Sequence, residues 1–322
     1  MMITALYRDI GIENELEQVQ EIMQDQLRRS TPFIREALGG LMEHSGKMLR
    51  PALLLLASRF GEGDKDKLFT LAAAVEMLHM ATLIHDDIID QAPSRRGIPT
   101  IHTVYGSRNA VLIGDFLFTR SFQLAADNTD MDAGRQIARA INSICESEIR
   151  QHERLSPASV SFREYHRRIM GKTAALFAIS AYIGAYQSEV AERTCRRLRK
   201  IGANIGAGFQ IIDDILDFSE VSASTGETPG ADIRQGIVNL PLLFALEKDD
   251  GTLAKRLNRR VRNGRRLKTI ISQTRNLEGI DRARSCARAY TAKALESIRL
   301  LPDSVYRSQL EDFTSFLLKR AY

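Results

Sequence analysis

Residues 83–90 read LIHDDIID, and residues 209–217 read FQIIDDILD. Each segment sets the pattern Asp-Asp-apolar-apolar-Asp within an otherwise apolar helical sequence. On an α-helix the first and third aspartates of this pattern lie one turn apart on one face, and the second lies about 100° around from the first. Carboxylates gathered on a largely buried face repel each other and are costly to desolvate unless a multivalent cation holds them. Two such segments in one chain therefore predict a metal-dependent site.

The donor atoms of both motifs favour one kind of metal. Neither motif has a set of cysteine and histidine residues beside it, so the available ligands are carboxylate oxygens. Magnesium prefers such oxygens and takes one or two protein carboxylates together with substrate phosphates. The sequence therefore predicts Mg2+ and a substrate that carries phosphate.

The composition is that of a soluble globular protein. The chain has 322 residues, of which 44% are hydrophobic and 26% charged, with a net charge of +5. Its three cysteines are widely spaced, which favours a cytoplasmic location and gives neither a disulfide framework nor a zinc site. The first residues soon become acidic and polar, so we expect no secretory signal. The longest apolar runs, 53–57 and 174–186, are too short or too interrupted to span a bilayer, and we expect peripheral membrane contact at most.

Helical periodicity dominates the chain. We expect helices at residues 9–29, 51–60, 65–90, 107–127, 131–153, 161–187 and 189–219, and further helices after Pro241. The passage 219–236 is rich in Ser, Thr and Gly and is expected to be a lid or binding loop. Because no strand-like alternation and no linker is evident, we predict an all-α fold with a single domain, residues 1–322. In this fold the two aspartate-bearing helices face each other across a central cavity.

The segment 255–268 holds eight basic residues and no acidic one. Such a run attracts nucleic acid or an anionic membrane surface. No aromatic residues alternate with the charges, and no nucleic-acid motif accompanies them. We therefore predict a solvated helix face and no nucleic-acid partner, with attraction to a membrane surface as the second interpretation.

Several cations are candidates for binding the expected phosphate. Lys47 and Arg50 lie one turn apart at a helix start, where free N–H groups also favour anions. Arg95 and Arg96 follow the first motif directly, and Lys172 lies between a glycine and a threonine. Each of these cations alone is better explained as a member of a surface ion pair. Their occurrence together with two acidic motifs favours phosphate binding.

The sequence contains two other segments that look like metal or phosphate sites. Gly171–Thr173 looks like the end of a P-loop, but His166 stands where that loop requires glycine and no strand precedes it. The pair His85-Asp86, with His44 and His79, fits a metal phosphohydrolase. That alternative stays open, although no histidine lies near Asp213 in the sequence.

The motifs together carry a family resemblance. The chain resembles the all-trans polyprenyl diphosphate synthases from about Ser30 to Tyr322. DDIID and DDILD look like the two aspartate-rich motifs of that family, and SGKMLRP looks like its GGKRLRP segment. RRG, GKTA and FQIIDD follow in the family order. The resemblance implies the isoprenoid synthase fold, a bundle of about a dozen helices around a deep cavity, usually dimeric.

The resemblance also implies the reaction, a head-to-tail condensation of isopentenyl diphosphate with an allylic diphosphate. Up to three Mg2+ ions would be held by Asp86, Asp87, Asp90, Asp213, Asp214 and Asp217. The allylic substrate would be contacted at its diphosphate by Arg95 and Lys172, and at its cationic carbon by Thr173 and Gln210. Isopentenyl diphosphate would be bound by Lys47, Arg50, His79 and Arg96. No side-chain nucleophile is expected.

Two positions depart from the family pattern. Glu227 and Ile237 stand where the family commonly has lysine, and Arg234 offers a partial substitute. A weakly active partner subunit of a heteromeric synthase therefore stays open.

The residues before the first motif bear on product length. Farnesyl-length members of the family typically have a bulky aromatic residue where this chain has Ala81 and Thr82. The resemblance therefore implies a long product, about C30–C40, with geranylgeranyl or farnesyl length as the alternative. The cavity floor is expected to be lined by Met77, Leu78 and Met80 as well. The alternative requires another side chain to close the cavity, such as Met77, Met80, Phe116 or Phe122.

The last residues, 316–322, read FLLKRAY and look like the ending of heptaprenyl diphosphate synthase catalytic subunits. Some of those proteins work only with a separate small subunit. This resemblance implies a possible heteromer beside the expected homodimer, and a product used as a quinone side chain.

Overall fold

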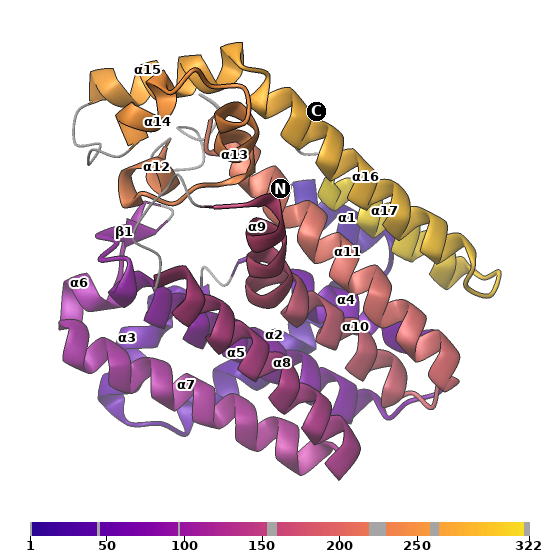
Figure 1. The fold of residues 1–322 in the computed structure, drawn as a ribbon. Coiled ribbons are helices and arrows are strands. Elements are labelled where there is room, and N and C mark those ends of the chain that lie inside the picture. The colour runs from indigo at the N-terminus through magenta and orange to yellow at the C-terminus, as the bar shows by residue number, and fades with distance from the viewer. Residues whose placement is uncertain are drawn as a thin grey trace. The chain divides into compact units, whose positions relative to one another are not determined.

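Helices account for nearly all of the described backbone (Figure 1). The computed structural model describes residues 2–43, 46–95, 97–152, 160–218, 230–257 and 264–318. The predicted all-α class is confirmed. The backbone divides into two compact units, the first formed by Met1–Arg139, Leu176–Gly202 and Ser297–Phe313, and the second by Ala140–Ala175, Ala203–Glu296 and Thr314–Tyr322. The single domain and the facing aspartate helices stay predictions.

The first unit is built around α5. Its helices are α1 (Met2–Asp9), α2 (Glu13–Arg28), α3 (Pro32–Glu43), α4 (Leu49–Ser58), α5 (Lys65–Ile89), α6 (Ile101–Tyr105), α7 (Ser107–Asn128) and most of α10 (Ala175–Tyr186). Helices α2, α4, α6 and α7 pack against α5, and α5 and α7 lie side by side (Figure 1). The side chain of Asp64 caps α5 by accepting hydrogen bonds from the backbone N–H groups of Asp66 and Lys67. The cap explains why this helix begins where the sequence predicts.

Two local features of the first unit differ from the prediction. The helix expected at 9–29 begins later, as α2 at Glu13, because Gly11 adopts a left-handed φ of 64° before it. The helix α1, which precedes Gly11, was not predicted. The basic loop after the first motif contains a short antiparallel hairpin, β1 (Ser94–Arg95) with β2 (Ile98–Pro99). Two residues per strand are too few for an alternating pattern to be visible in a sequence.

The second unit holds the remaining elements. They are α9 (Phe162–Ile169), the π-helical turn η2 (Met170–Ala174), α12 (Ala231–Gln235), α13 (Leu240–Leu246), α14 (Thr252–Leu257) and α15 (Gly264–Asn276). One part of each of four long helices lies in each unit, namely α8 (Met131–His152), α11 (Glu192–Leu216), α16 (Gly279–Arg299) and α17 (Val305–Leu318). The helix expected at 161–187 is therefore α9, η2 and α10 in succession, with a π-helical turn that the sequence did not predict.

Two segments are long and apolar enough to cross a membrane by length and composition alone, Lys65–Ile89 and Phe162–Tyr186. The sequence analysis, which considered shorter apolar runs, did not predict these two segments. Most of each segment is buried within the protein, as the core helices of soluble proteins are.

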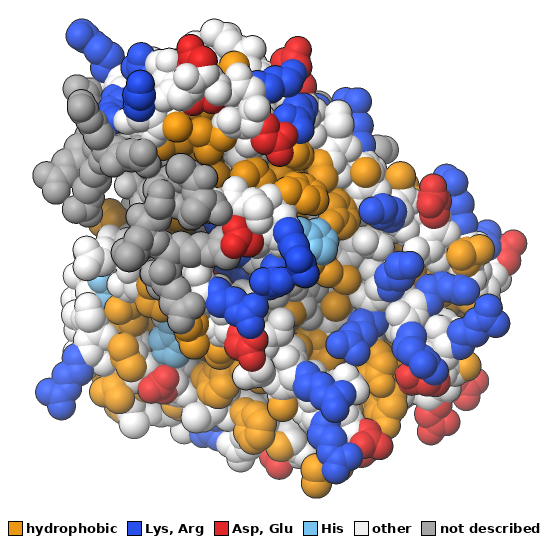
Figure 2. Space-filling model, in the orientation of Figure 1, with side chains coloured by type: hydrophobic (Ala, Val, Ile, Leu, Met, Phe, Trp, Pro, Cys, Tyr) orange, Lys and Arg blue, Asp and Glu red, His pale blue; other side chains and the backbone are white. Residues whose placement is uncertain are grey.

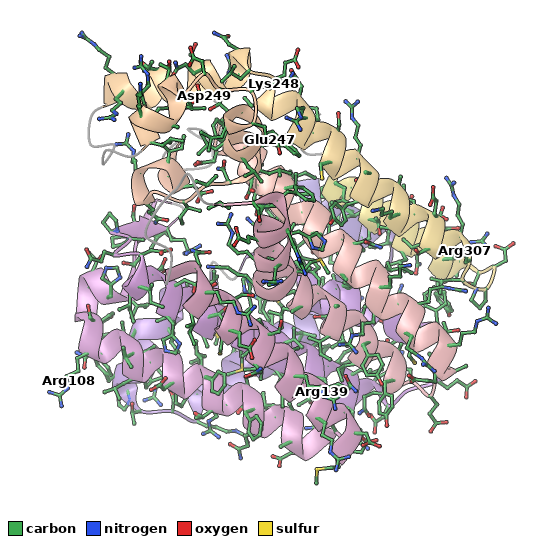
Figure 3. All side chains as sticks on the ribbon, in the orientation of Figure 1. Arg108, Arg139, Glu247, Lys248, Asp249 and Arg307 are labelled. Carbon is green, nitrogen blue, oxygen red and sulfur yellow. The ribbon has the colours of Figure 1, made fainter. Side chains whose placement is uncertain are left out.

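Charges of both signs are spread over the face seen in Figure 2. After α13, Glu247 accepts a hydrogen bond of 2.6 Å from Arg282, and Lys248 pairs with Glu278 (Figure 3). Exposed ion pairs of this kind contribute little to stability. Of the basic segment 255–268, residues 258–263 lie outside the described part of the chain, so its predicted role as a solvated helix face stays a prediction.

Candidate active site

The first aspartate motif ends α5. Asp86 is half-buried, Asp87 is buried, and Asp90 is the residue that follows the helix. Arg95, on the hairpin, lies with Nε 2.9 Å and Nη2 2.8 Å from the same oxygen of Asp87. The structure thus brings together two residues that the sequence singled out. The cation beside Asp87 offsets the cost of burying its carboxylate.

His85 is turned toward α7 rather than toward other histidines. Its Nε2 lies 3.4 Å from a carboxylate oxygen of Asp115 and 3.5 Å from the carbonyl oxygen of Val111. A Cβ added at Gly114 would lie 2.3 Å from the same nitrogen, so the glycine makes room for the ring. Within the described ranges no three His, Cys, Asp or Glu side chains form a group that could hold a metal. Among these described residues, neither the histidines of the phosphohydrolase alternative nor the aspartates of the two motifs form such a group.

The predicted contacts to isopentenyl diphosphate are described in part. Arg50, in the first turn of α4, is buried, and its guanidinium lies 4.7 Å from the centre of the Phe177 ring. This is within the range of a cation–π interaction. Lys47 and His79 are half-buried, and Tyr7 donates a hydrogen bond to the backbone carbonyl of Lys47. His44 and Arg96 lie outside the described residues.

The second motif lies on α11, within the second unit. Asp213 is exposed, whereas Asp214 is only 4% exposed. One oxygen of Asp214 accepts hydrogen bonds from the Tyr165 hydroxyl at 2.7 Å and from the backbone N–H of Leu240 at 3.2 Å. The other oxygen accepts from Gln210 Nε2 at 3.0 Å. Burial raises the pKa of the Asp214 carboxyl, and burial followed by the Asp214 charge raises that of the Tyr165 hydroxyl.

The same hydrogen bonds continue to the π-helical turn. Thr173 donates a hydrogen bond of 2.6 Å to Gln210 Oε1. Lys172, next to it, lies with Nζ 2.7 Å from a carboxylate oxygen of Glu148. The π-helical turn packs closely against α8, since a Cβ added at Gly171 would lie 1.8 Å from Ser147 Oγ. Single π-helical turns of this kind often occur at functional sites.

Carboxylates also gather where α11 ends. Asp217 accepts a 2.9 Å hydrogen bond from the N–H of Ala231, while its Oδ2 is buried and makes no hydrogen bond with the described residues. Burial, and next the charge of Asp232, raise the pKa of Asp217 to about 7. Burial and the charge of Asp214 raise the pKa of Asp232 to about 6. Buried oxygen donors with uncompensated negative charge fit a divalent cation such as Mg2+.

Sequence reasoning missed several residues of this region. Tyr165, Glu148 and Asp232 were not expected to contact the predicted site residues, and neither was Arg168, whose Nη2 donates a 2.9 Å hydrogen bond to the carbonyl of Val238. A tyrosine on an apolar helix face resembles an ordinary core residue. A glutamate on α8 resembles an ordinary surface charge. No sequence pattern marks either one.

The two departures from the family pattern are described in part. Ile237 is half-buried after α12, and the Nε atom of Arg234 is buried without a hydrogen bond among the described residues. Glu227 lies outside the described part of the chain.

Comparison with known proteins identifies the family. A family model described as polyprenyl synthetase matches residues 31–275. Heptaprenyl diphosphate synthase component 2 from Geobacillus stearothermophilus is 34% identical over 322 residues, which cover 100% of each protein.

Solved structures agree with this result. The crystal structure of polyprenyl synthase from Caulobacter crescentus, complexed with calcium and isoprenyl diphosphate, has a TM-score of 0.93 and 31% identity, covering 99% of this chain and 98% of that one. The geranylgeranyl pyrophosphate synthase from Lactobacillus brevis has a TM-score of 0.90 and 34% identity, covering 98% of this chain and 100% of that one. The chain therefore belongs to the polyprenyl synthetase family and is a prenyltransferase.

Proposed function

We propose that this prenyltransferase condenses isopentenyl diphosphate head to tail with an allylic diphosphate, with Mg2+ as cofactor. The observation that carries the proposal is the pair of half-buried carboxylates near the end of α11, Asp217 and Asp232. The raised pKa values of Asp217 and Asp232 mean that negative charge is held there at a cost. A cation–diphosphate complex would remove that cost, because it supplies the missing positive charge.

The proposed metal ligands differ in how well they can reach an ion. Asp213 is exposed, and Asp86, Asp90 and Asp217 are partly exposed. Asp87 and Asp214 are buried, and they already accept hydrogen bonds from protein groups. We propose all six aspartates as metal ligands, and these two would have to give up a protein hydrogen bond or accept the ion beside it.

The chemistry requires the departure of diphosphate from the allylic substrate. Bound Mg2+ would stabilise the negative charge that develops on the leaving group. We propose that Arg95 and Lys172 share that task. Both now pair with carboxylates, Asp87 and Glu148, which hold the two cations in place until a diphosphate competes for them.

The carbocation left behind needs electron-rich neighbours and a second substrate. We propose that the oxygens of Thr173 and Gln210 border it. We further propose that Lys47, Arg50, His79 and Arg96 bind isopentenyl diphosphate, whose double bond attacks the cation. The proton is then lost to the departing diphosphate, so no side-chain base is required.

We propose a long product, about C30–C40. Ala81 is small and 1% exposed, and no aromatic residue stands at this point of α5. Of the side chains proposed to close the cavity instead, Phe122 is exposed on α7. The named relatives include a heptaprenyl and a geranylgeranyl synthase, so product length needs a direct measurement.

The proposed assembly is a homodimer or a heteromer with a small subunit. The relative from Geobacillus stearothermophilus is named as component 2 of its synthase, which favours a second component. A cytoplasmic location stays a prediction.

The experiment that tests the proposal compares two aspartate variants. Asp213→Ala removes a proposed ligand, and Asp281→Ala removes an exposed aspartate on α16 that pairs with Arg284. We expect Asp213→Ala to lower kcat by about 10²-fold or more and to raise the Mg2+ concentration needed for half-maximal rate. Asp281→Ala should leave both unchanged. Equal activity of the two variants would contradict the proposal.

A further inference from the structure

Within the second unit, three hydrogen bonds connect a buried tyrosine, through two intervening side chains, to a residue of the proposed site. We propose that Tyr165 is a positioning residue that acts through Asp214 and Gln210 to fix the direction of the Thr173 hydroxyl. This inference rests on the proposed function, in which Thr173 borders the allylic carbon. It adds a role for Tyr165, which lies seven residues before Lys172 on the preceding helix.

The connection runs through three elements. Tyr165 on α9 donates 2.7 Å to Asp214 on α11, and Gln210, one turn earlier on α11, donates 3.0 Å to the other Asp214 oxygen. Gln210 Oε1 then accepts a 2.6 Å hydrogen bond from Thr173 in the π-helical turn. The N–H of Leu240, at the start of α13, completes the set around Asp214.

The polarity of this chain follows from the chemistry of Asp214. The Tyr165 hydroxyl and the Leu240 N–H both donate to one oxygen of Asp214, Oδ2. An ionised carboxylate has no proton to donate, so its other oxygen, Oδ1, is an acceptor as well. Gln210 must present its NH2 group to Asp214, so its carbonyl oxygen faces Thr173. The only proton of the Thr173 hydroxyl is then committed to Gln210, and the hydroxyl offers a substrate only lone pairs. Lone pairs stabilise a neighbouring cation, whereas an O–H dipole pointing at it would repel it.

The surroundings hold these groups firmly. Tyr165 is 1% exposed, and the Arg168 guanidinium lies 5.3 Å from the centre of its ring. Arg168 is itself tied to the backbone carbonyl of Val238 at 2.9 Å. Thr173 is buried in a π-helical turn, and its hydroxyl reaches Gln210 on α11. Loss of the Tyr165 hydroxyl therefore changes the hydrogen bonds of Asp214 without opening a large cavity.

The simpler interpretation is that Tyr165 and Asp214 are a satisfied core pair that contributes only stability. The two interpretations differ in how substitutions combine. If Tyr165 acts by orienting the Thr173 hydroxyl, it has no group left to orient once that hydroxyl is removed. A second substitution at Tyr165 then has little further effect on kcat. If Tyr165 is only structural, the two effects on kcat multiply.

The experiment is a double-mutant cycle on the full chain, with Tyr165→Phe, Thr173→Val and the double variant. We expect Tyr165→Phe to lower kcat roughly tenfold while KM for isopentenyl diphosphate changes less than about twofold. The double variant should match Thr173→Val within about twofold, and Thr173→Ser should retain most activity because it keeps the hydroxyl. Tyr186→Phe is the matched control, since it removes a 2.8 Å tyrosine–aspartate hydrogen bond to Asp130 in the first unit.

A second readout needs no turnover. The side-chain amide resonance of Gln210, observed by NMR of the resting protein, should shift in Tyr165→Phe and in Thr173→Val but not in Tyr186→Phe. Multiplicative losses of kcat, or an unshifted Gln210 amide in Tyr165→Phe, would overturn the inference. An inactive wild-type chain would instead contradict the proposed function, and the Gln210 resonance would still show whether the Tyr165 hydroxyl influences Gln210.

Discussion

Arg95 and Asp87 form a close ion pair, in which two guanidinium nitrogens lie 2.9 and 2.8 Å from one carboxylate oxygen. The arginine comes from the hairpin after α5 and the aspartate from the last turn of that helix. This contact ties a residue proposed to bind diphosphate to the first aspartate motif.

The ion pair gives a prediction for Arg95→Gln. We expect KM for the allylic diphosphate to rise about tenfold, because a charge-assisted contact to phosphate is lost. We also expect stability to fall by about 1 kcal/mol, less than for a fully buried pair, since the Arg95 side chain is 39% exposed. Steady-state kinetics and thermal unfolding measure the two effects separately. A loss of stability with unchanged KM would mean that Arg95 stabilises the Asp87 carboxylate and does not bind the diphosphate.

The close contact between Gly171 and Ser147 gives a prediction of compensation. A Cβ at position 171 would meet Ser147 Oγ at 1.8 Å and Ser147 Cβ at 3.0 Å. Gly171→Ala should therefore cost about 1–3 kcal/mol through overpacking. In a Ser147→Gly background the same substitution should cost clearly less, because both atoms are removed. Chemical denaturation of the four proteins tests this, and an equal cost in both backgrounds would show that the clash is relieved elsewhere.

Ala81 tests the proposed product length. Ala81→Phe should shorten the product from about C30–C40 toward C15–C20, because it places an aromatic ring where farnesyl-length members carry one. It should also cost about 1–3 kcal/mol, since Ala81 is 1% exposed. Ala283→Phe on α16 is the control, because Ala283 is equally buried. It should lower stability without changing product length. An unchanged product from Ala81→Phe would mean that another side chain sets the length.

The thiols of Cys145 and Cys195 are predicted to differ in how fast a thiol reagent labels them at a given pH. Cys145 is exposed, whereas Cys195 is buried and its thiol donates a 3.0 Å hydrogen bond to the Val190 carbonyl. Burial, and next the charge of Glu192, raise the pKa of Cys195 to about 11. The reactive form is the thiolate, so at pH 8 only about one Cys195 in 10³ is reactive. A thiol reagent should label Cys145 first, and labelling of Cys195 should rise with pH. Equal rates at pH 8 would contradict the burial of Cys195.

Structural features that neighbouring residues determine could be predicted from the sequence, and features without such a local pattern could not. The apolar period predicts a helix at 65–90, and the observed helix is Lys65–Ile89. The agreement is close because periodicity and the Asp64 cap both act within a few residues. The helix α1 and the break at Gly11 that separates it from α2 were missed, since a helical period does not show where a helix begins. The hairpin at 94–99 was missed because its two-residue strands carry no period.

The motifs predict the residues of the candidate site, but they do not predict the contacts that these residues make. Thr173, Gln210 and Asp214 are separated by 37 and 4 residues in the sequence, and only packing shows that they are joined. Tyr165 lies 49 residues from Asp214. A hydrogen-bond partner so far away in the sequence does not affect the local sequence pattern around Tyr165.

The measurement that tests the central claim most directly is elongation by the protein itself. The chain would be purified alone and also captured with its partners from cells of its source organism. Each preparation would be incubated with labelled isopentenyl diphosphate, farnesyl diphosphate and Mg2+, and the extracted products separated by chromatography. The account predicts a ladder of prenyl products that ends at about C30–C40 and disappears when a chelator removes Mg2+. No labelled prenyl product from either preparation of folded protein would contradict it.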